Sequence, residues 1–150
     1  MKKQSCQLIS LSKLPIFAKK ILFTLNNTRC LTLSGELGSG KTTFTQQIGK
    51  LLRIKNKITS PTFVLLKVYS LPKNNYQLRS LCHVDLYRAQ KGSYLFLQEY
   101  LNNPEVLTVI EWPNKIKKLP LPRIDIKFQI ISHHTRKISV NLKSGKKKLA

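Results

Sequence analysis

The sequence predicts one α/β domain with a three-layer fold, built on a mixed, largely parallel sheet that ends in a C-terminal β-hairpin. Three observations lead to this prediction. A glycine-rich loop separates a short β-prone run, residues 30–33, from a stretch with helical periodicity. The continuous apolar run at residues 106–110 is typical of a buried parallel strand. Alternating apolar residues on both sides of a polar turn near the C-terminus indicate the hairpin.

The glycine-rich loop matches the phosphate-binding pattern G-x-x-x-x-G-K-[ST], with Gly35, Gly40, Lys41 and Thr42 at the fixed positions. Its backbone N–H groups can converge on an anion, at which the following helix aims its N-terminal dipole. Lys41 is expected to reach the β- and γ-phosphates, and the Thr42 hydroxyl to bind Mg²⁺. The sequence therefore predicts a P-loop NTPase-like fold. The expected nucleotide-binding residues are Gly35, Glu36, Leu37, Gly38, Ser39, Gly40, Lys41, Thr42 and Thr43.

Length and composition are typical of a single domain with its own core, because the chain has 150 residues. We expect the P-loop domain at residues 1–142 and a basic, disordered tail at 143–150. No apolar run is long enough to cross a bilayer, and the N-terminus lacks the apolar segment of a signal peptide. The three cysteines lack metal-ligand spacing, and two lie in expected strands. Buried, reduced thiols in a cytoplasmic protein without a membrane partner are therefore expected.

The formal net charge of +21 comes from 27 basic and only 6 acidic residues. Such a charge favours nucleic acid or acidic partners. The excess is mainly lysine beside abundant Ile and Asn, which is also the product of AT-biased coding. The lysines are scattered rather than interleaved with aromatic residues. Charge alone therefore does not decide the function.

Before the phosphate loop, residues 1–11 are expected to form an arm or an edge strand that contains the run Gln7-Leu8-Ile9. A helix with apolar residues at helical spacing should follow, with Ser12 as its N-cap and Pro15 in its first turn. Asn26 and Asn27 should end it. The helix after the loop is expected to bury one face. The residues of that face are Phe44, Ile48, Leu51 and Leu52.

Two β-rich runs around a polar loop, residues 64–69 and 77–85, predict a hairpin. Thr62 precedes it in the segment Ser-Pro-Thr-Phe. Taken alone, Ser60 and Thr62 resemble ordinary turn residues. In a nucleotide-binding fold, however, a threonine-bearing loop downstream of the phosphate loop is where a γ-phosphate sensor lies.

Two of the six acidic residues stand at the ends of expected strands. Asp85 follows His83 in alternation, so both lie on one face, and a salt bridge to Arg88 is the alternative to a functional role. Glu111 ends the buried apolar strand, where the acidic residue of a nucleotide-binding fold meets Mg²⁺. Trp112, the only tryptophan, is either a core anchor or a lid or contact residue beside Glu111.

The remaining chain contains a weak helical pattern within residues 89–101 and the terminal hairpin, with alternating residues over 124–130 and 138–142. Arg136 stands at the turn of this hairpin, from where its guanidinium could reach a nucleotide. His133 and His134 have no neighbouring acids or cysteines, so they are expected to be turn residues rather than metal ligands.

Four segments together resemble the TsaE (YjeE) family in order, spacing and chain size. They are the phosphate loop with Thr43, Ser60-Pro61-Thr62-Phe63, His83-Val84-Asp85-Leu86-Tyr87-Arg88 and Ile110-Glu111-Trp112-Pro113. The resemblance covers about residues 11 to 142. It implies a small bacterial ATPase that is needed to form threonylcarbamoyladenosine in tRNAs that read ANN codons.

The resemblance also implies partners and roles. The family works with TsaD and TsaB subunits and meets tRNA through their complex, and ATP hydrolysis is thought to reset that machine. By position, Thr42 and Glu111 would hold Mg²⁺, Lys41 would hold the phosphates of ATP, and Asp85 would be essential to hydrolysis. Thr62 would belong to a switch loop, Trp112 would be needed for function, and Arg136 resembles a C-terminal nucleotide contact.

The chain departs from the family pattern at residues 89–94, where members carry an acidic Pro-Glu-Glu-Leu-like stretch. A threonine of the first helix that often contacts the base also lacks a counterpart among residues 12–15. Two other functions remain open from the residues themselves. One is a P-loop kinase for a small acceptor, although the chain has only six scattered arginines for a lid. The other is a basic RNA-binding module with a vestigial nucleotide site.

Overall fold

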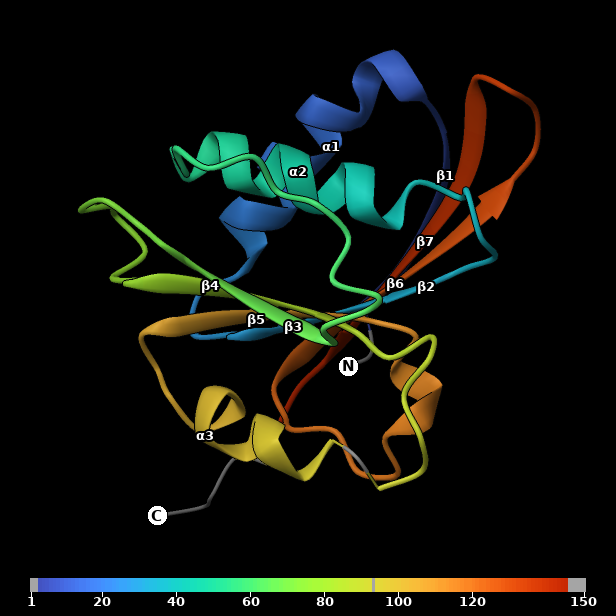
Figure 1. The fold of residues 1–150 in the computed structure, drawn as a ribbon. Helices are drawn as coiled ribbons and strands as arrows, with labels where there is room; N and C mark the ends of the chain where they lie inside the picture. The colour runs from blue at the N-terminus through green and yellow to red at the C-terminus, as the bar shows by residue number, and fades with distance from the viewer. Residues whose placement is uncertain (1–2, 93, 146–150) are drawn as a thin grey trace.

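The protein is described by a computed structural model over residues 3–92 and 94–145. Within these residues one sheet of seven strands has the order β1-β7-β6-β2-β5-β4-β3. Helices α1 and α2 cover one face of the sheet, and the short helix α3 lies on the other (Figure 1). This arrangement confirms the expected three-layer α/β fold.

The strands are β1 (Lys3–Ser10), β2 (Cys30–Ser34), β3 (Leu66–Ser70), β4 (Ser80–Asp85), β5 (Val106–Glu111), β6 (Arg123–Ile130) and β7 (Thr135–Lys143). The helices are α1 (Leu14–Thr24), α2 (Lys41–Leu51) and α3 (Gln98–Leu101), with 3-10 turns η1 (Leu11–Lys13), η2 (Leu95–Leu97) and η3 (Pro113–Lys115).

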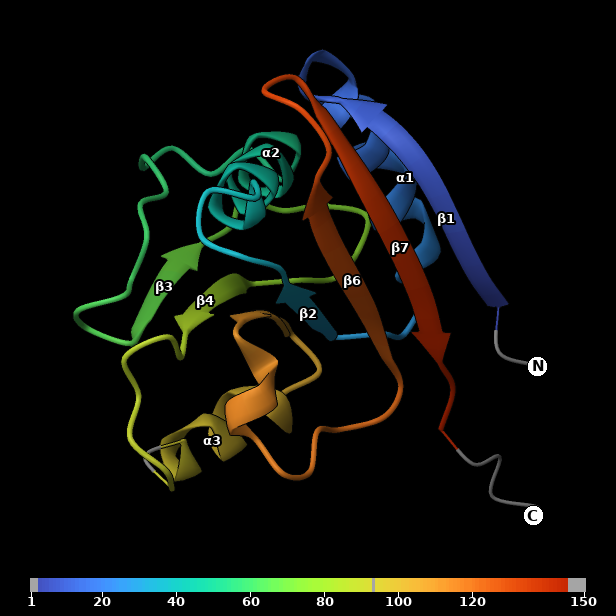
Figure 2. The ribbon, with the colours of Figure 1, turned by 90° about the vertical axis from the view of Figure 1, so that its right-hand side faces the viewer.

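The centre of the sheet is parallel and its edges are antiparallel. Strands β6, β2, β5 and β4 run parallel to one another, whereas the pairs β1–β7, β7–β6 and β4–β3 are antiparallel. All six residues of β5 are buried, because helical layers cover the sheet on both faces. The expected mixed sheet and the C-terminal hairpin β6–β7 are confirmed. Figure 2 shows β1, β7 and β6 side by side, with β1 as the outer strand.

The N-terminus of α1 differs from the sequence prediction. Ser12 lies inside η1, where its hydroxyl is 3.0 Å from the Ser10 hydroxyl, and Lys13 is the N-cap without a side-chain bond. The Ser12 cap was therefore wrong, because the 3-10 turn runs directly into the helix. Pro15 does lie in the first turn of α1.

The buried stripe of α2 also differs from the expected one. Phe44, Ile48 and Leu52 are buried, but Leu51 is 39% exposed. Thr45 and Gly49 belong to the buried stripe as well, which moves its centre away from Leu51. Because Gly49 has no side chain, the following connector can approach the helix closely, and an added Cβ would clash with Ile58 Cδ1.

The cysteines behave as the sequence suggested. All three are free, with Cys30 and Cys82 buried and Cys6 exposed. Burial raises the pKa of both the Cys30 and the Cys82 thiol to about 12. At the C-terminus, Lys143 belongs to β7 rather than to the expected tail, and residues 146–150 of that tail lie outside the described part of the chain.

The core beneath α1 and α2 depends on Phe44. This side chain is fully buried, and its ring centroid lies 5.6 Å from that of Phe17 on α1 and 5.8 Å from that of Phe128 on β6. Phe44 thus joins the two helices to the sheet just after the phosphate loop.

Replacing Phe44 by alanine should lower the free energy of unfolding by about 3–5 kcal/mol, because it removes buried area and leaves a cavity. Urea unfolding followed by circular dichroism measures the effect. Phe63→Ala is the control, since Phe63 is 80% exposed and its loss should change stability by less than about 0.5 kcal/mol. Equal losses for the two variants would contradict this account of the core.

Candidate functional site

The phosphate loop connects β2 to α2, and its glycines have the backbone that the motif requires. Gly35 has φ +146°, and an added Cβ there would lie only 2.5 Å from the Phe128 carbonyl oxygen. Gly40 has φ +107° and is the N-cap of α2. Its carbonyl accepts the Phe44 N–H at 2.8 Å, which starts the helix. A side chain at Gly35 or Gly40 would strain or displace the loop.

Lys41 lies back over its own loop and is 5% exposed. Its Nζ donates to Gly35 O at 2.7 Å and Glu36 O at 2.9 Å, and lies 3.4 Å from Ser39 Oγ. It also stands 4.5 Å from the centroid of the Trp112 ring. Burial lowers the pKa of Lys41, while the negative charges of Glu111, Asp85 and Glu36 oppose this shift. The loop therefore contains a partly desolvated ammonium group.

The hydroxyl of Thr42 points at the carboxylate that ends β5. Thr42 Oγ1 donates to Glu111 Oε1 at 2.9 Å. The same oxygen lies 2.8 Å from His83 Nε2, and both side chains of this second pair are almost fully buried. The phosphate loop, β5 and β4 therefore meet at a single carboxylate oxygen.

Asp85 ends β4 directly beside Glu111, its register partner on β5. Its Oδ2 accepts the Thr62 hydroxyl at 2.7 Å and the Ser60 hydroxyl at 3.2 Å, and its Oδ1 accepts the Tyr87 N–H at 2.9 Å. Asp85 is 3% exposed. The expected Thr62 loop is thus fastened to Asp85 by side-chain hydrogen bonds.

The alternative of a salt bridge between Asp85 and Arg88 is wrong. The guanidinium of Arg88 instead lies 4.5 Å from the centroid of the Phe63 ring. Within residues 3–92 and 94–145, the ion pairs involve other acids than Asp85. The Asp85 carboxylate instead accepts hydrogen bonds from two hydroxyls and one backbone N–H.

Trp112 is half-buried, packs against a cluster of buried apolar residues and also contacts side chains of the site. Its ring centroid lies 4.9 Å from that of Tyr87, and the Lys41 ammonium faces the indole. The backbone has φ +58°, which is rare for a bulky residue. Its N–H donates to Leu33 O at 3.2 Å, which helps to hold this conformation. The strained backbone aims the ring at Lys41 and Tyr87.

Arg136 lies in β7 just after the β6–β7 turn and contacts the phosphate loop from the side. Its Nε donates to Ser39 O at 2.9 Å and its Nη2 to Gly38 O at 3.3 Å. Its Nη1 donates to Ser132 O at 2.7 Å and to Thr135 O at 3.1 Å. The guanidinium therefore joins the turn to the loop backbone, and a direct contact with nucleotide stays a prediction.

Sequence reasoning missed two contacts of this site. It placed His83 on the face of Asp85 but gave it no partner, and it treated Ser60 as a turn residue. The only available signal was the position of His83 two residues before Asp85. Its meeting with Glu111 requires β4 and β5 to be neighbours, which is a property of the sheet order.

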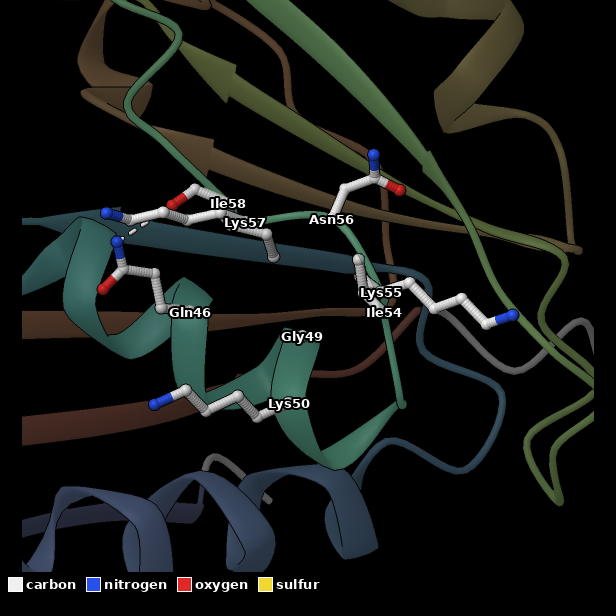
Figure 3. A pocket seen from close by; sticks show the side chains of 8 residues that line it. All are labelled: Gln46, Gly49, Lys50, Ile54, Lys55, Asn56, Lys57 and Ile58. Atoms are coloured by element: carbon white, nitrogen blue, oxygen red, sulfur yellow. Dashed lines mark hydrogen bonds between the residues drawn. The ribbon is translucent and has the colours of Figure 1, made fainter.

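A separate cavity of about 340 Å³ lies between α2 and the connector that follows it (Figure 3). No phosphate-loop glycine, Lys41 or Thr42 lines it, so it is not the nucleotide site. Its lining residues are Gln46, Gly49, Lys50, Ile54, Lys55, Asn56, Lys57 and Ile58. Gln46 closes one side by donating to Ile58 O at 2.9 Å.

The residues at the sheet edge fit a magnesium–nucleotide complex. A hydroxyl that donates its hydrogen to a carboxylate, as Thr42 does to Glu111, keeps lone pairs for a metal ion. Among the described residues, no group of three or more His, Cys, Asp or Glu side chains could hold a metal ion alone. Such a group is not required for Mg²⁺, which usually takes one or two protein ligands besides phosphate oxygens and water.

The chain is similar to known proteins over most of its length. A family model described as "Threonylcarbamoyl adenosine biosynthesis protein TsaE" matches residues 8–138. The chain belongs to the TsaE family. It is 35% identical over 130 residues to the tRNA threonylcarbamoyladenosine biosynthesis protein TsaE of Rickettsia prowazekii, covering 83% of this chain and 85% of that protein.

TsaE of Aquifex aeolicus is 31% identical over 125 residues, covering 82% of this chain and 84% of that protein. The crystal structure of Bacillus subtilis YdiB is similar with a TM-score of 0.73 at 29% identity, over 96% of this chain and 88% of that chain. The TsaE fold is therefore present over almost the whole chain. Within the described residues, no helix is both long and apolar enough to cross a membrane.

If Arg136 acts by holding the loop backbone, Arg136→Lys should weaken ATP binding nearly as much as Arg136→Leu. Lysine keeps the charge but cannot make the four donations of a guanidinium, so we expect a loss of about tenfold in both variants. Titration with a fluorescent ATP analogue measures the affinity. Arg79→Leu is the control, because Arg79 lies in an exposed ion pair with Glu105. Full affinity in Arg136→Lys would instead indicate a direct charge contact.

Proposed function

We propose that this chain is the ATP-binding and ATP-hydrolysing subunit required for threonylcarbamoyladenosine formation in tRNAs that read ANN codons. It acts in the cytoplasm with TsaD-like and TsaB-like partners and reaches tRNA through their complex. The observation that carries this proposal is the hydrogen bond of 2.9 Å between Thr42 in the phosphate loop and Glu111 at the end of β5. Membership of the TsaE family supports the assignment to this tRNA modification.

Lys41 and the backbone N–H groups of the phosphate loop hold the phosphates of ATP. Thr42, through its hydroxyl oxygen, and Glu111, directly or through a water, would hold Mg²⁺. Such an ion would supply charge neutralisation for the phosphates, which is the main electrostatic requirement of phosphoryl transfer. To hold a γ-phosphate, the Lys41 ammonium must exchange at least one of its contacts with its own loop for a phosphate oxygen.

Asp85 has two roles: it orients the water molecule that attacks the γ-phosphate, and it holds the switch loop that contains Thr62. Its Oδ2 is occupied by the hydroxyls of Thr62 and Ser60, so it becomes available to orient a water molecule only when the loop moves. Thr62, once released from Asp85, can turn its hydroxyl toward the γ-phosphate. The contact between Thr62 and Asp85 therefore keeps hydrolysis slow in the isolated protein.

The partner dependence has a physical basis in the same loop. Phe63 and Val64 directly follow Thr62, and their side chains are 80% and 61% exposed. A partner protein that covers these apolar side chains would change the position of the loop. We expect the ATPase activity to rise when TsaD-like and TsaB-like subunits are added.

Lys41→Ala should reduce ATP hydrolysis by about a hundredfold or more, because it removes the only side-chain cation of the phosphate loop. Release of labelled phosphate from ATP, with and without the partner subunits, measures the rate. Lys50→Ala is the control, since Lys50 is an exposed lysine near the far end of the same helix. Equal hydrolysis by wild type and Lys41→Ala would refute the site, and transfer of label to a nucleoside rather than to water would favour a kinase.

Glu111→Gln and Asp85→Asn should separate metal binding from hydrolysis. Glu111→Gln should raise the Mg²⁺ concentration needed for ATP binding by about tenfold or more, because one metal-binding charge is lost. Asp85→Asn should leave ATP affinity nearly unchanged and lower hydrolysis by about a hundredfold. Equilibrium binding at varied Mg²⁺ and single-turnover hydrolysis test both. The reverse pattern would exchange the two roles.

A further inference from the structure

His83 is a fully buried imidazole in β4 whose only hydrogen bond among the described residues is made to Glu111. Its side chain has 0% exposure, and its Nε2 lies 2.8 Å from Glu111 Oε1. Its Nδ1 is also buried and has no partner there. The single hydrogen bond of this buried side chain is made to a carboxylate of the nucleotide site, and such an arrangement requires a physical explanation.

The unpartnered nitrogen decides which nitrogen carries the hydrogen. A hydrogen on Nδ1 would be a buried donor without an acceptor, which is more costly than an unused lone pair. The hydrogen therefore lies on Nε2, and His83 donates to Glu111. The imidazole is also fully buried, so packing limits its rotation.

Two donors thus converge on Glu111 Oε1, one from each side of the site. Thr42 comes from the phosphate loop, which must adapt to the nucleotide, whereas His83 comes from the sheet. Neither of these hydrogen bonds uses Oε2. When the Thr42 oxygen binds a metal ion, the His83 bond still fixes the plane of the carboxylate and the direction of its free oxygen.

We propose that His83 is a positioning residue that orients Glu111 for Mg²⁺. This inference rests on the proposed function, in which Glu111 serves the metal. Outer-shell donors of this kind set the orientation of metal-binding groups, and their loss typically costs about tenfold to a hundredfold in metal affinity or activity.

The test compares two substitutions at His83 that differ in their ability to donate. His83→Gln can place an amide N–H close to the position of Nε2, whereas His83→Leu fills space without a donor. Thr108→Val is the matched control, because Thr108 lies on the neighbouring strand, is fully buried and has an unpartnered hydroxyl. Binding of a fluorescent ATP analogue is measured in EDTA and then as a function of Mg²⁺ concentration.

We expect His83→Leu to raise the midpoint Mg²⁺ concentration by about tenfold or more and to leave affinity in EDTA within about twofold. His83→Gln should restore the midpoint to within about threefold of wild type, and Thr108→Val should match wild type. An unchanged midpoint in His83→Leu would overturn the inference. A midpoint in His83→Gln as high as in His83→Leu would also overturn it, because packing rather than donation would then be responsible.

Thermal unfolding by circular dichroism first establishes that each variant is folded. If His83→Leu does not fold, His83→Gln is compared with His83→Asn, which carries the same amide on a shorter side chain. Only the asparagine variant should then show a raised Mg²⁺ midpoint, and equal midpoints would overturn the inference. If the wild-type protein binds the analogue without any Mg²⁺ dependence, the proposed function itself is refuted. If the wild-type protein shows the expected Mg²⁺ dependence and His83→Leu behaves in the same way, only the role of His83 is refuted.

Discussion

The carboxyl ends of three neighbouring parallel strands meet at one edge of the sheet, and the candidate site depends on this alignment. Strand β2 leads into the phosphate loop, β4 ends at Asp85, and β5 ends at Glu111. Leu33 on β2 and Asp85 on β4 are both register partners of Glu111, so Glu111 lies between the ends of β2 and β4. A shift of one residue in either pairing would move the carboxylate to the other face of the sheet.

The two neighbouring carboxylates differ in their donors, and this difference suggests different tasks. Glu111 accepts from the phosphate loop and from a buried imidazole, so its environment couples it to the nucleotide. Asp85 accepts from the hydroxyls of a partly exposed loop, so its environment couples it to a segment that a partner can reach. Lys41 lies near both charges, which oppose the effect of burial on its pKa. A movement of the Thr62 loop can therefore change Asp85 without disturbing Glu111.

Most of the fold was predictable because its signals are local. The apolar run of β5, the alternation of β6 and β7, and the glycine spacing before α2 each depend on a few consecutive residues. The errors occurred where local patterns compete. Ser12 failed as a cap because a 3-10 turn already precedes α1, and Leu51 is exposed because Thr45 and Gly49 share the buried stripe of α2.

The sequence by itself determined the phosphate loop, the two carboxylates at strand ends and the family, because motif residues and their spacing are properties of a linear chain. Only the tertiary structure decided that His83 pairs with Glu111, that Thr62 donates to Asp85, and that Arg136 contacts the loop backbone. These pairs lie 28, 23 and 97 residues apart along the chain. Their meeting depends on strand order, register and the curvature of a hairpin, and one sequence does not specify these quantities residue by residue.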